Sequence, residues 1–485
     1  MKKLLSAIIA LLLCISIVAC DSGKNTDNNP NKENGNKTEE TTTGNGNVNT
    51  PPVSGSENVN TPPVSGSEGE NNGNEETPDK TPENLAEIYI KYPNLFQIGA
   101  FYNGLASFHV FNLDDRGRSS AKYGYVDING NVVIEPIYSE TYITYAPSFS
   151  EGNYVTVNGT MIIDKRGEVI FRVGENGVSK LGKVSNGYFA VETKKEEFTG
   201  YVYTLTYYSA IDGKKIVELP NTSYYYDVQK DGTAGEINIS DYDPSFIPKT
   251  DNWSVDVGGI EAFQGVYCRY NVSSSNNSLG QIATVVLTNK DNISYYATVD
   301  SKGNVLMAPQ KNISFEIDNH TISAFSNDLC AAKDTSTGFW GYINPYGEWV
   351  IQPQYYEATP FTEDGYATVN RNIVIDKTGK TIIAPKFVEY SEIAGTYTGK
   401  FRNGANGYVT AVVSENGNIE FIYHSIISIS YKGSFELHNN MIVISGINDP
   451  NHYIHIDHDS NDNGAHTIVL DGEDLVINGL RWTKD

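Results

Sequence analysis

Short apolar runs recur along the chain after residue 85, and polar turns that contain Gly separate them. Two segments align without a gap: YGYVDINGNVVIEPIY from residue 123 and WGYINPYGEWVIQPQY from residue 340. Gly, Tyr, Gly, Val, Ile, Pro and Tyr occupy matching positions in both. A repeat of a few tens of residues is one supersecondary unit that buries its apolar face only by stacking on its neighbours. The pattern therefore predicts a tandem-repeat domain.

Each repeat contains a predicted β-hairpin. An Asp or Asn opens the turn, Gly follows three residues later, and two aliphatic residues and a Pro come after it. Four copies keep this register from Asp127, Asp300, Asn344 and Asp376, and degenerate copies start at Asp164 and Asp212. Such spacing suits a type I turn that closes on a residue with positive φ. Because Pro has no N–H, the second strand should end there or lie at a sheet edge.

A second element precedes most hairpins and predicts a third strand. It consists of an apolar anchor, a polar turn that usually carries Gly, and a short run with small residues. The copies are FYNGLASF from Phe101, FSEGNYVTV from Phe149, VSNGYFAV from Val184, FSNDLCAA from Phe325, FTEDGYATV from Phe361 and the looser FQGVYCRY from Phe263. Each repeat should therefore be a three-stranded antiparallel meander, with room for a fourth short strand.

The copy WGYINPYGEWVIQPQYYEATPFTEDGYATV resembles the WG-repeat family, which is named for a Trp-Gly pair, here Trp340 and Gly341. Tyr123 and Gly124 replace that pair in the first copy, and the other copies lack it. The resemblance extends over residues 98–413. It implies structure-forming positions and brings no catalytic residues with it.

The expected fold is all-β. Composition agrees, because 33 Tyr and 44 Gly beside only 4 Met favour sheets with tight turns. Six to eight meanders arranged radially would make a β-propeller, which protects strand edges. The interval between Gly213 and Gly303 predicts a further degenerate unit near YYYDVQKDGTAGEINI. We expect the repeat domain at residues 85–415 and a last blade or cap at 416–485; an open β-repeat stack is the alternative.

The N-terminus predicts export and a lipid anchor. Lys2 and Lys3 precede an apolar run at residues 4–18, which is shorter than the ~20 residues of a spanning helix. The run leads into Ile-Val-Ala-Cys, which resembles a bacterial lipobox ending at Cys20. The resemblance implies a signal peptide at residues 1–19 and a diacylglycerol on Cys20, whose two acyl chains suffice for stable anchoring. An uncleaved signal anchor or an ordinary secretory signal are the alternatives.

Residues 20–84 are expected to form a disordered stalk. Residues 21–84 contain no aromatic side chain, hold twelve acidic and four basic residues, and include two consecutive copies of the block NVNTPPVSGSE. With so few apolar side chains this segment cannot offset the entropy cost of ordering. A flexible chain of 64 residues would span ~45 Å, which would hold the folded part away from the bilayer. A partner in the envelope or outside the cell is therefore expected.

The charge and the cysteine positions limit which partners and which thiol chemistry we expect. A net charge of −24 without a long basic run argues against nucleic acid as a partner. Cys14 falls in the signal peptide, so Cys268 and Cys330 are the cysteines of the repeat region. Both follow the Phe of their repeats by five residues, where the first copy has Ala106. We interpret them as small packing residues rather than as a disulfide or reactive thiols.

One polar cluster is a candidate metal site. His455, Asp457 and Asp459 would share a strand face in HYIHIDHDSNDNGAH, and the segment from Asp459 matches the start of a calcium loop. However, Leu470 stands where such a loop needs its bidentate Glu. We therefore favour a polar turn between two strands over a metal site.

The sequence predicts a noncatalytic protein. It contains no P-loop, HExxH helix or GxSxG elbow in the folded region. We expect no cofactor, and a lipid-anchored binding or scaffold module on the extracytoplasmic face that presents its β-repeat surface, including exposed Tyr, to an envelope protein or glycan. The alternative is a hydrolase of envelope polymers or a metal-dependent enzyme, which strand-end loops that gather carboxylates or His into one pocket would favour.

Overall fold

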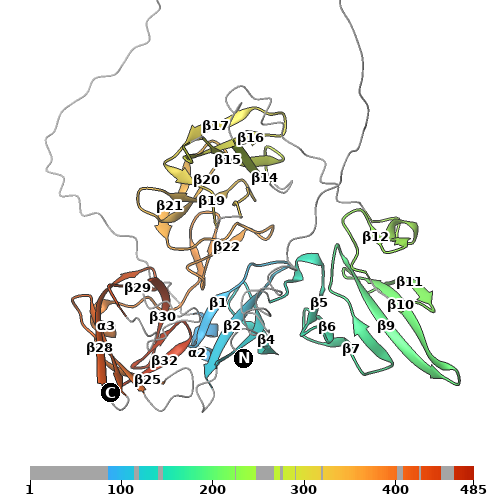
Figure 1. The fold of residues 1–485 in the computed structure, drawn as a ribbon, viewed down its shortest axis with the longest axis horizontal. Helices are drawn as coiled ribbons and strands as arrows, with labels where there is room; N and C mark the ends of the chain where they lie inside the picture. Colours follow the sequence, from blue (N-terminus) through green and yellow to red (C-terminus); the bar gives the residue numbers. More distant parts are fainter. Residues whose placement is uncertain are drawn as a thin grey trace, which may run out of the picture. The chain divides into compact units, whose positions relative to one another are not determined.

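The structure is a computed structural model that describes residues 86–485 except 114–118, 140–145, 224–225, 247–266, 273–276, 290, 318–320, 401–407, 425–427 and 449–463. Contacts within the chain group Asn74–Asp485 into one compact unit. The regular elements of the described part are almost all antiparallel β-strands (Figure 1). The expected signal peptide, Cys20 and the expected stalk lie outside them.

The repeats form separate meander sheets whose strands follow one another in sequence. Four sheets have four strands: β1–β4 (Leu95–Ile98, Leu105–Leu113, Ser119–Asp127, Val132–Ser139), β8–β11 (Val178–Leu181, Tyr188–Glu197, Gly200–Ser209, Lys215–Pro220), β14–β17 (Tyr267–Val272, Ile282–Thr288, Ser294–Asp300, Val305–Gln310) and β18–β21 (Ile313–Ser314, Cys330–Asp334, Trp340–Ile343, Trp349–Tyr355). Two have three strands: β5–β7 (Tyr154–Val157, Met161–Asp164, Val169–Arg172) and β22–β24 (Tyr366–Val369, Ile373–Asp376, Thr381–Ile383). The tandem meanders predicted from the sequence are confirmed.

A two-stranded pair lies where the sequence predicts a degenerate unit. Its strands are β12 (Thr233–Ala234) and β13 (Ile237–Asn238). Short helical turns complete the described elements: α2 (Glu87–Lys91), η1 (Phe149–Glu151), η2 (Ile239–Asp241) and α3 (Tyr390–Ile393).

The hairpin turns have the predicted geometry. The carboxylate of Asp127 accepts hydrogen bonds from the N–H groups of Asn129 and Asn131, each 2.9 Å long. This arrangement holds the turn before Gly closes it. Gly130, Gly303, Gly347 and Gly379 have φ of 81°, 84°, 85° and 85°. The register that the sequence assigns to these four copies is therefore correct.

The Gly of the Trp-Gly pair is required by a close approach of the next strand. A Cβ on Gly341 would clash with the carbonyl oxygen of Ile351, and one on Gly124 would clash with that of Ile134. The pairing register shifts opposite each Gly, so the last strand of the meander is bulged there.

The repeat Pro lies within this bulged strand. Pro136 and Pro353 belong to β4 and β21, which are the last strands of their sheets. Both Pro residues therefore lie in edge strands, as predicted. Both strands nevertheless continue beyond the Pro, so the Pro marks an edge without ending the strand.

Aromatic contacts join one repeat to the next. The rings of Tyr342 and Phe361 lie 4.7 Å apart, and the Tyr342 hydroxyl donates to the carbonyl of Thr359 at 2.8 Å. Tyr125 repeats the arrangement, with Phe149 at 5.0 Å and the carbonyl of Pro147 at 2.7 Å. In these two copies the apolar anchor, Phe361 or Phe149, is thus the residue on which the preceding repeat packs.

Successive sheets share apolar cores. Such cores join β1–β4 to β5–β7, β5–β7 to β8–β11, β8–β11 to β12–β13, β14–β17 to β18–β21, and β18–β21 to β22–β24. The last repeat sheet also packs on the first, because Val374 and Ile383 lie in one core with Ile98 and Phe108. The N–H of Ile98 donates to the carbonyl of Arg371 at 2.8 Å. Contact between the first and last sheets is the packing of a β-propeller, not of an open stack.

The propeller-type fold class is therefore confirmed. The expectation of six to eight blades stays a prediction, because residues 247–266, between the β12–β13 pair and β14, lie outside the described part.

The C-terminal region is a closed barrel of eight antiparallel strands. Its strands are β25 (Gly395–Lys400), β26 (Tyr408–Val413), β27 (Asn418–His424), β28 (Ser428–His438), β29 (Met441–Ser445), β30 (Gly464–Asp471), β31 (Asp474–Ile477) and β32 (Leu480–Lys484). Pairing of β25 with β32 closes it. Buried side chains such as Tyr397, Phe421 and Trp482 belong to its core.

This barrel corrects the expected domain boundary. Residues 415 and 416 lie between β26 and β27, inside the barrel, so the C-terminal element starts at Gly395 and is not a blade. The pairing of β25 with β32 and of β26 with β27 places these two strands in the barrel and not in a repeat.

Candidate ligand-binding cavity

The structure does not describe the residues predicted as a metal site. His455, Asp457 and Asp459 lie in residues 449–463, outside the described part. Where the structure does describe the chain, it holds no group of three or more His, Cys, Asp or Glu arranged to bind a metal ion. The candidate metal site and the polar turn both stay predictions.

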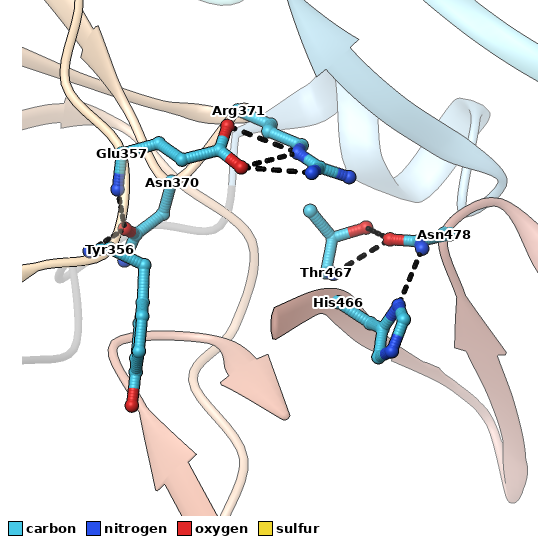
Figure 2. A network of polar contacts seen from close by, with 7 residues as sticks. All are labelled: Tyr356, Glu357, Asn370, Arg371, His466, Thr467 and Asn478. Atoms are coloured by element: carbon cyan, nitrogen blue, oxygen red, sulfur yellow. Dashed lines mark hydrogen bonds and ion pairs between the residues drawn. The ribbon is translucent and has the colours of Figure 1, made fainter. Parts of the chain in front are cut away.

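His466, at the end of the same motif, lies in the described part of the chain. His466 is buried, and its Nδ1 lies 2.9 Å from the side-chain nitrogen of Asn478. The side-chain oxygen of Asn478 accepts from the N–H of Thr467 at 2.9 Å (Figure 2). These bonds tie β30 to the turn between β31 and β32, so His466 belongs to the architecture of the barrel.

The neighbouring polar contacts hold the last repeat against the barrel. The guanidinium of Arg371 donates to both carboxylate oxygens of Glu357 at 2.8–3.1 Å (Figure 2). Asn370 accepts from the N–H of Tyr356 at 2.8 Å and donates to the carbonyl of Asn439 in the barrel at 3.2 Å. The network thus joins the β22–β23 turn to the β28–β29 turn and has a structural role.

Cys330 packs as the sequence predicts. It is a free cysteine with its side chain fully buried in the core of β14–β21. Burial raises the pKa of the Cys330 thiol to about 12. The thiol is therefore protonated and inert at neutral pH. The side chain of Cys268, on β14, lies outside the description.

A cavity of about 270 Å³ lies beside the β8–β11 sheet. Its lining comes from the turn before β9, from β9 itself, from the β10–β11 turn and from the segment after η2. The lining residues include Asn186, Tyr188, Asp212, Lys214, Asp243 and Phe246. The sequence analysis placed Tyr188 and Asp212 in repeat elements and did not identify the cavity.

Local structure explains how these residues meet. Tyr188 begins β9 and is buried, whereas Asp212 opens the shortened Asp-Gly turn and is exposed. The Tyr188 hydroxyl donates to the Asp243 carboxylate at 2.9 Å, which holds the segment after η2 against the sheet. The rings of Tyr188 and Phe246 lie 5.8 Å apart. The cavity therefore combines an aromatic wall with charged groups.

Both carboxylates in the cavity favour their ionised form. The hydroxyl and N–H of Ser245, helped by Tyr188, hold the pKa of Asp243 below its usual value. The Ser209 hydroxyl, helped by the N–H of Lys214, does the same for Asp212. Burial and the bond to Asp243 raise the pKa of Tyr188, so its phenol stays neutral and remains a donor. The cavity thus combines two carboxylates with the side chain of Lys214.

Several repeat Tyr residues of the described part are buried and cannot serve as surface contacts. Tyr125 and Tyr342 are fully buried. The exposed Tyr residues of the described part are Tyr201, Tyr226, Tyr242, Tyr270, Tyr346 and Tyr408. The sequence-based expectation that exposed Tyr residues make contacts therefore applies to this smaller set. In addition, no helix in the described ranges has the length and apolar character needed to cross a membrane.

Comparison with known families finds the WG containing repeat at residues 123–158 and 340–372. Among curated proteins, none matches this chain.

Among solved structures, the chain is similar to the Pyrococcus horikoshii acylaminoacyl peptidase, at 8% identity and a TM-score of 0.22 over 74% of this chain and 59% of that one. It is similar to the β-propeller domain of the Trilobed protease from Pyrococcus furiosus, at 8% identity and 0.14 over 79% and 98%. It is also similar to the BP39L lectin from Burkholderia pseudomallei, at 9% identity and 0.13 over 80% and 97%. The chain spans about three fifths of the length of the first of these proteins. Likenesses at these TM-scores carry no argument about function.

Proposed function

This chain carries WG repeats, and we propose that it is a noncatalytic binding protein of the cell envelope whose β-repeat domain binds a glycan. In this proposal the signal peptide directs export, a lipid on Cys20 holds the protein to a membrane, and residues 20–84 extend the domain from it. The observation that carries the binding role is the cavity between Tyr188, Asp212 and Asp243.

The chemistry of the cavity suits a sugar. A sugar ring has apolar C–H faces and a rim of hydroxyls, and the cavity pairs the rings of Tyr188 and Phe246 with charged hydrogen-bonding groups. Its volume of about 270 Å³ lies just below the ~300–1,000 Å³ range of small-molecule sites. That size fits a single sugar residue, such as the end or a side branch of a polymer.

The two carboxylates favour binding over hydrolysis. A glycosidase needs one carboxylic acid whose pKa is raised, so that it can protonate the leaving oxygen. Hydrogen bonds lower the pKa of both Asp212 and Asp243. A general acid is therefore missing from this pair, although two carboxylates in one cavity keep an envelope hydrolase as the second candidate.

A glycan array probed with the 74–485 unit tests the proposal. Calorimetric titration with the best-binding oligosaccharide should then show that Asp243→Asn weakens binding at least tenfold, because the amide keeps the shape but loses the charge. Asp231→Asn is the control, since Asp231 is a turn carboxylate that also accepts hydrogen bonds from a residue two positions later but does not line the cavity.

Three outcomes would contradict the proposal. Absence of any bound glycan would remove the glycan as the partner, and equal affinity in both variants would place binding elsewhere. New reducing ends after incubation of the unit with the bound oligosaccharide would establish the hydrolase instead.

A further inference from the structure

The second and third strands of the β8–β11 sheet extend beyond their neighbours. Strands β9 and β10 pair along their whole length, from Tyr188 and Ser209 to Glu197 and Gly200. Strand β8 pairs with β9 only as far as Thr193, and β11 pairs with β10 only from Thr204. Residues 194–203 therefore form a two-stranded arm (Figure 1). Phe198 at its tip is fully exposed, at 108%.

The pairing pattern shows which backbone groups of the arm point outward. Glu197 and Gly200 flank a two-residue turn, so they form a hydrogen-bonded pair, and such pairs alternate with non-hydrogen-bonded ones. Tyr201 and Tyr203 therefore direct their N–H and C=O groups away from β9. Lys194, which faces Tyr203, confirms this phase, because its N–H donates outward to the carbonyl of Gly177 at 2.7 Å.

Along this outer edge of β10, between Gly200 and Tyr203, the described part of the chain supplies no pairing strand. Proteins usually protect exposed edges with charged residues or Pro. The neighbouring edges follow that rule, because β9 carries Lys194 and Lys195 and β11 ends at Pro220. The β10 edge reads Gly-Tyr-Val-Tyr and has no charge.

We infer that the edge of β10 from Gly200 to Tyr203 pairs with the same edge of a second copy of this chain. In a two-fold antiparallel arrangement centred on Val202, each Tyr201 faces the Tyr203 of the other copy. Both are residues that direct N–H and C=O outward, so they form the hydrogen-bonded pairs of the ladder. The two Val202 residues face each other between them. Aromatic and β-branched pairs of this kind stabilise neighbouring strands.

Charge also favours a second copy at this position. The chain has a net charge of −24, so most of its surface should repel another copy. The arm is locally neutral, because Lys194 and Lys195 balance Glu196 and Glu197. Contact through the arms therefore joins two copies where the repulsion is weakest.

The ladder is short and the association should be weak. Beyond Thr204 the edge of β10 is occupied by β11, so only residues 201–203 of each copy pair. Interfaces of this size belong to the weak and transient class. Confinement of both copies to one membrane surface, which rests on the proposed lipid anchor, would raise their effective concentration.

Cysteine cross-linking of the 74–485 unit tests the pairing. Directly opposite residues in a non-hydrogen-bonded pair have Cα atoms about 4.5 Å apart, within the range of a disulfide. Val202→Cys should therefore form a covalent dimer at least tenfold faster than Glu196→Cys when oxidised glutathione is added. Glu196 is the matched control, because it lies on the same arm but on the other strand.

Sedimentation equilibrium of the wild-type unit is the second measurement. Its mass should rise with concentration toward that of a dimer, and Val202→Lys, which places two ammonium groups face to face, should remain monomeric with an unchanged circular dichroism spectrum. Equal cross-linking rates for the two cysteine variants would overturn the inference. A wild-type unit that stays monomeric would also overturn it and would indicate that this edge pairs with a strand of another protein. A Val202→Lys variant that still dimerises would show that the two copies meet at another surface.

Discussion

The hydroxyl of Tyr188 lies 2.9 Å from a carboxylate oxygen of Asp243 and donates a hydrogen bond to it. The two residues are 55 positions apart, so this bond joins the start of β9 to the segment that follows η2. Asp243 also accepts a hydrogen bond from the hydroxyl of Ser245 at 2.6 Å. The wall of the cavity therefore depends on an ionised carboxylate.

The stability of this wall should depend on pH. Hydrogen bonds from Ser245 and Tyr188 hold the pKa of Asp243 below its usual value in the folded state. Its stabilising contribution is therefore complete above the unfolded-state pKa of about 3.9 and is lost as pH falls through the lower folded-state pKa. Chemical denaturation across this acidic range should show a smaller loss of unfolding free energy for Asp243→Asn than for wild type. Parallel losses would mean that Asp243 does not contribute.

Two turn glycines allow the cost of backbone strain to be measured apart from the cost of side-chain crowding. Gly347 and Gly303 have nearly the same φ, 85° and 84°, but a Cβ on Gly347 would meet the side chain of Met307, whereas one on Gly303 meets nothing within 4 Å. Gly303→Val should cost about 1–3 kcal/mol through backbone strain alone. Gly347→Val should cost at least as much. Thermal unfolding measures both, and an unchanged midpoint in either variant would contradict the assigned turn.

A further prediction concerns Gly341 of the Trp-Gly pair. A Cβ on Gly341 would clash with backbone atoms of the bulged strand, and backbone moves less readily than a side chain. Gly341→Ala should therefore destabilise the domain by about 1–3 kcal/mol. Gly182→Ala is the control, because its Cβ would lie 3.3 Å from Ala190 and needs only a small adjustment. Equal unfolding midpoints for the two variants would show that the bulge adapts.

Local features were predictable and long-range closure was not. The hairpin turns follow from residues within four positions of Asp127, and a sequence shows such spacing directly. Closure of the barrel depends on Thr398 pairing with Thr483, and alternation along a strand does not show which strand becomes its neighbour. The cavity was missed for the same reason, since Tyr188 and Asp243 meet only through the fold.

Cys20 should be the mature N-terminus and should carry the lipid. The basic pair, the apolar run and Ile-Val-Ala-Cys occur in the order that lipoprotein processing needs. Cys20→Ala should move the protein from the membrane fraction to the soluble fraction, because two acyl chains supply most of the membrane affinity. Mass spectrometry of the N-terminal peptide checks the modification. An unlipidated chain that still sediments with membranes would refute the anchor.

The C-terminal His and Asp residues should not form a metal site. A zinc site needs at least three ligand atoms within ~2.0–2.3 Å of one ion, and a calcium loop needs its final carboxylate. His466 is instead buried beside Asn478 in the barrel, and Leu470 occupies the position of that carboxylate within β30. This leaves His455, Asp457 and Asp459 as the candidates. Calorimetric titration of the metal-free 74–485 unit with Zn²⁺ and Ca²⁺ should therefore show no stoichiometric binding. Binding that disappears when His455 and Asp457 are replaced by Ala would overturn this prediction and make the metal-dependent enzyme the leading hypothesis.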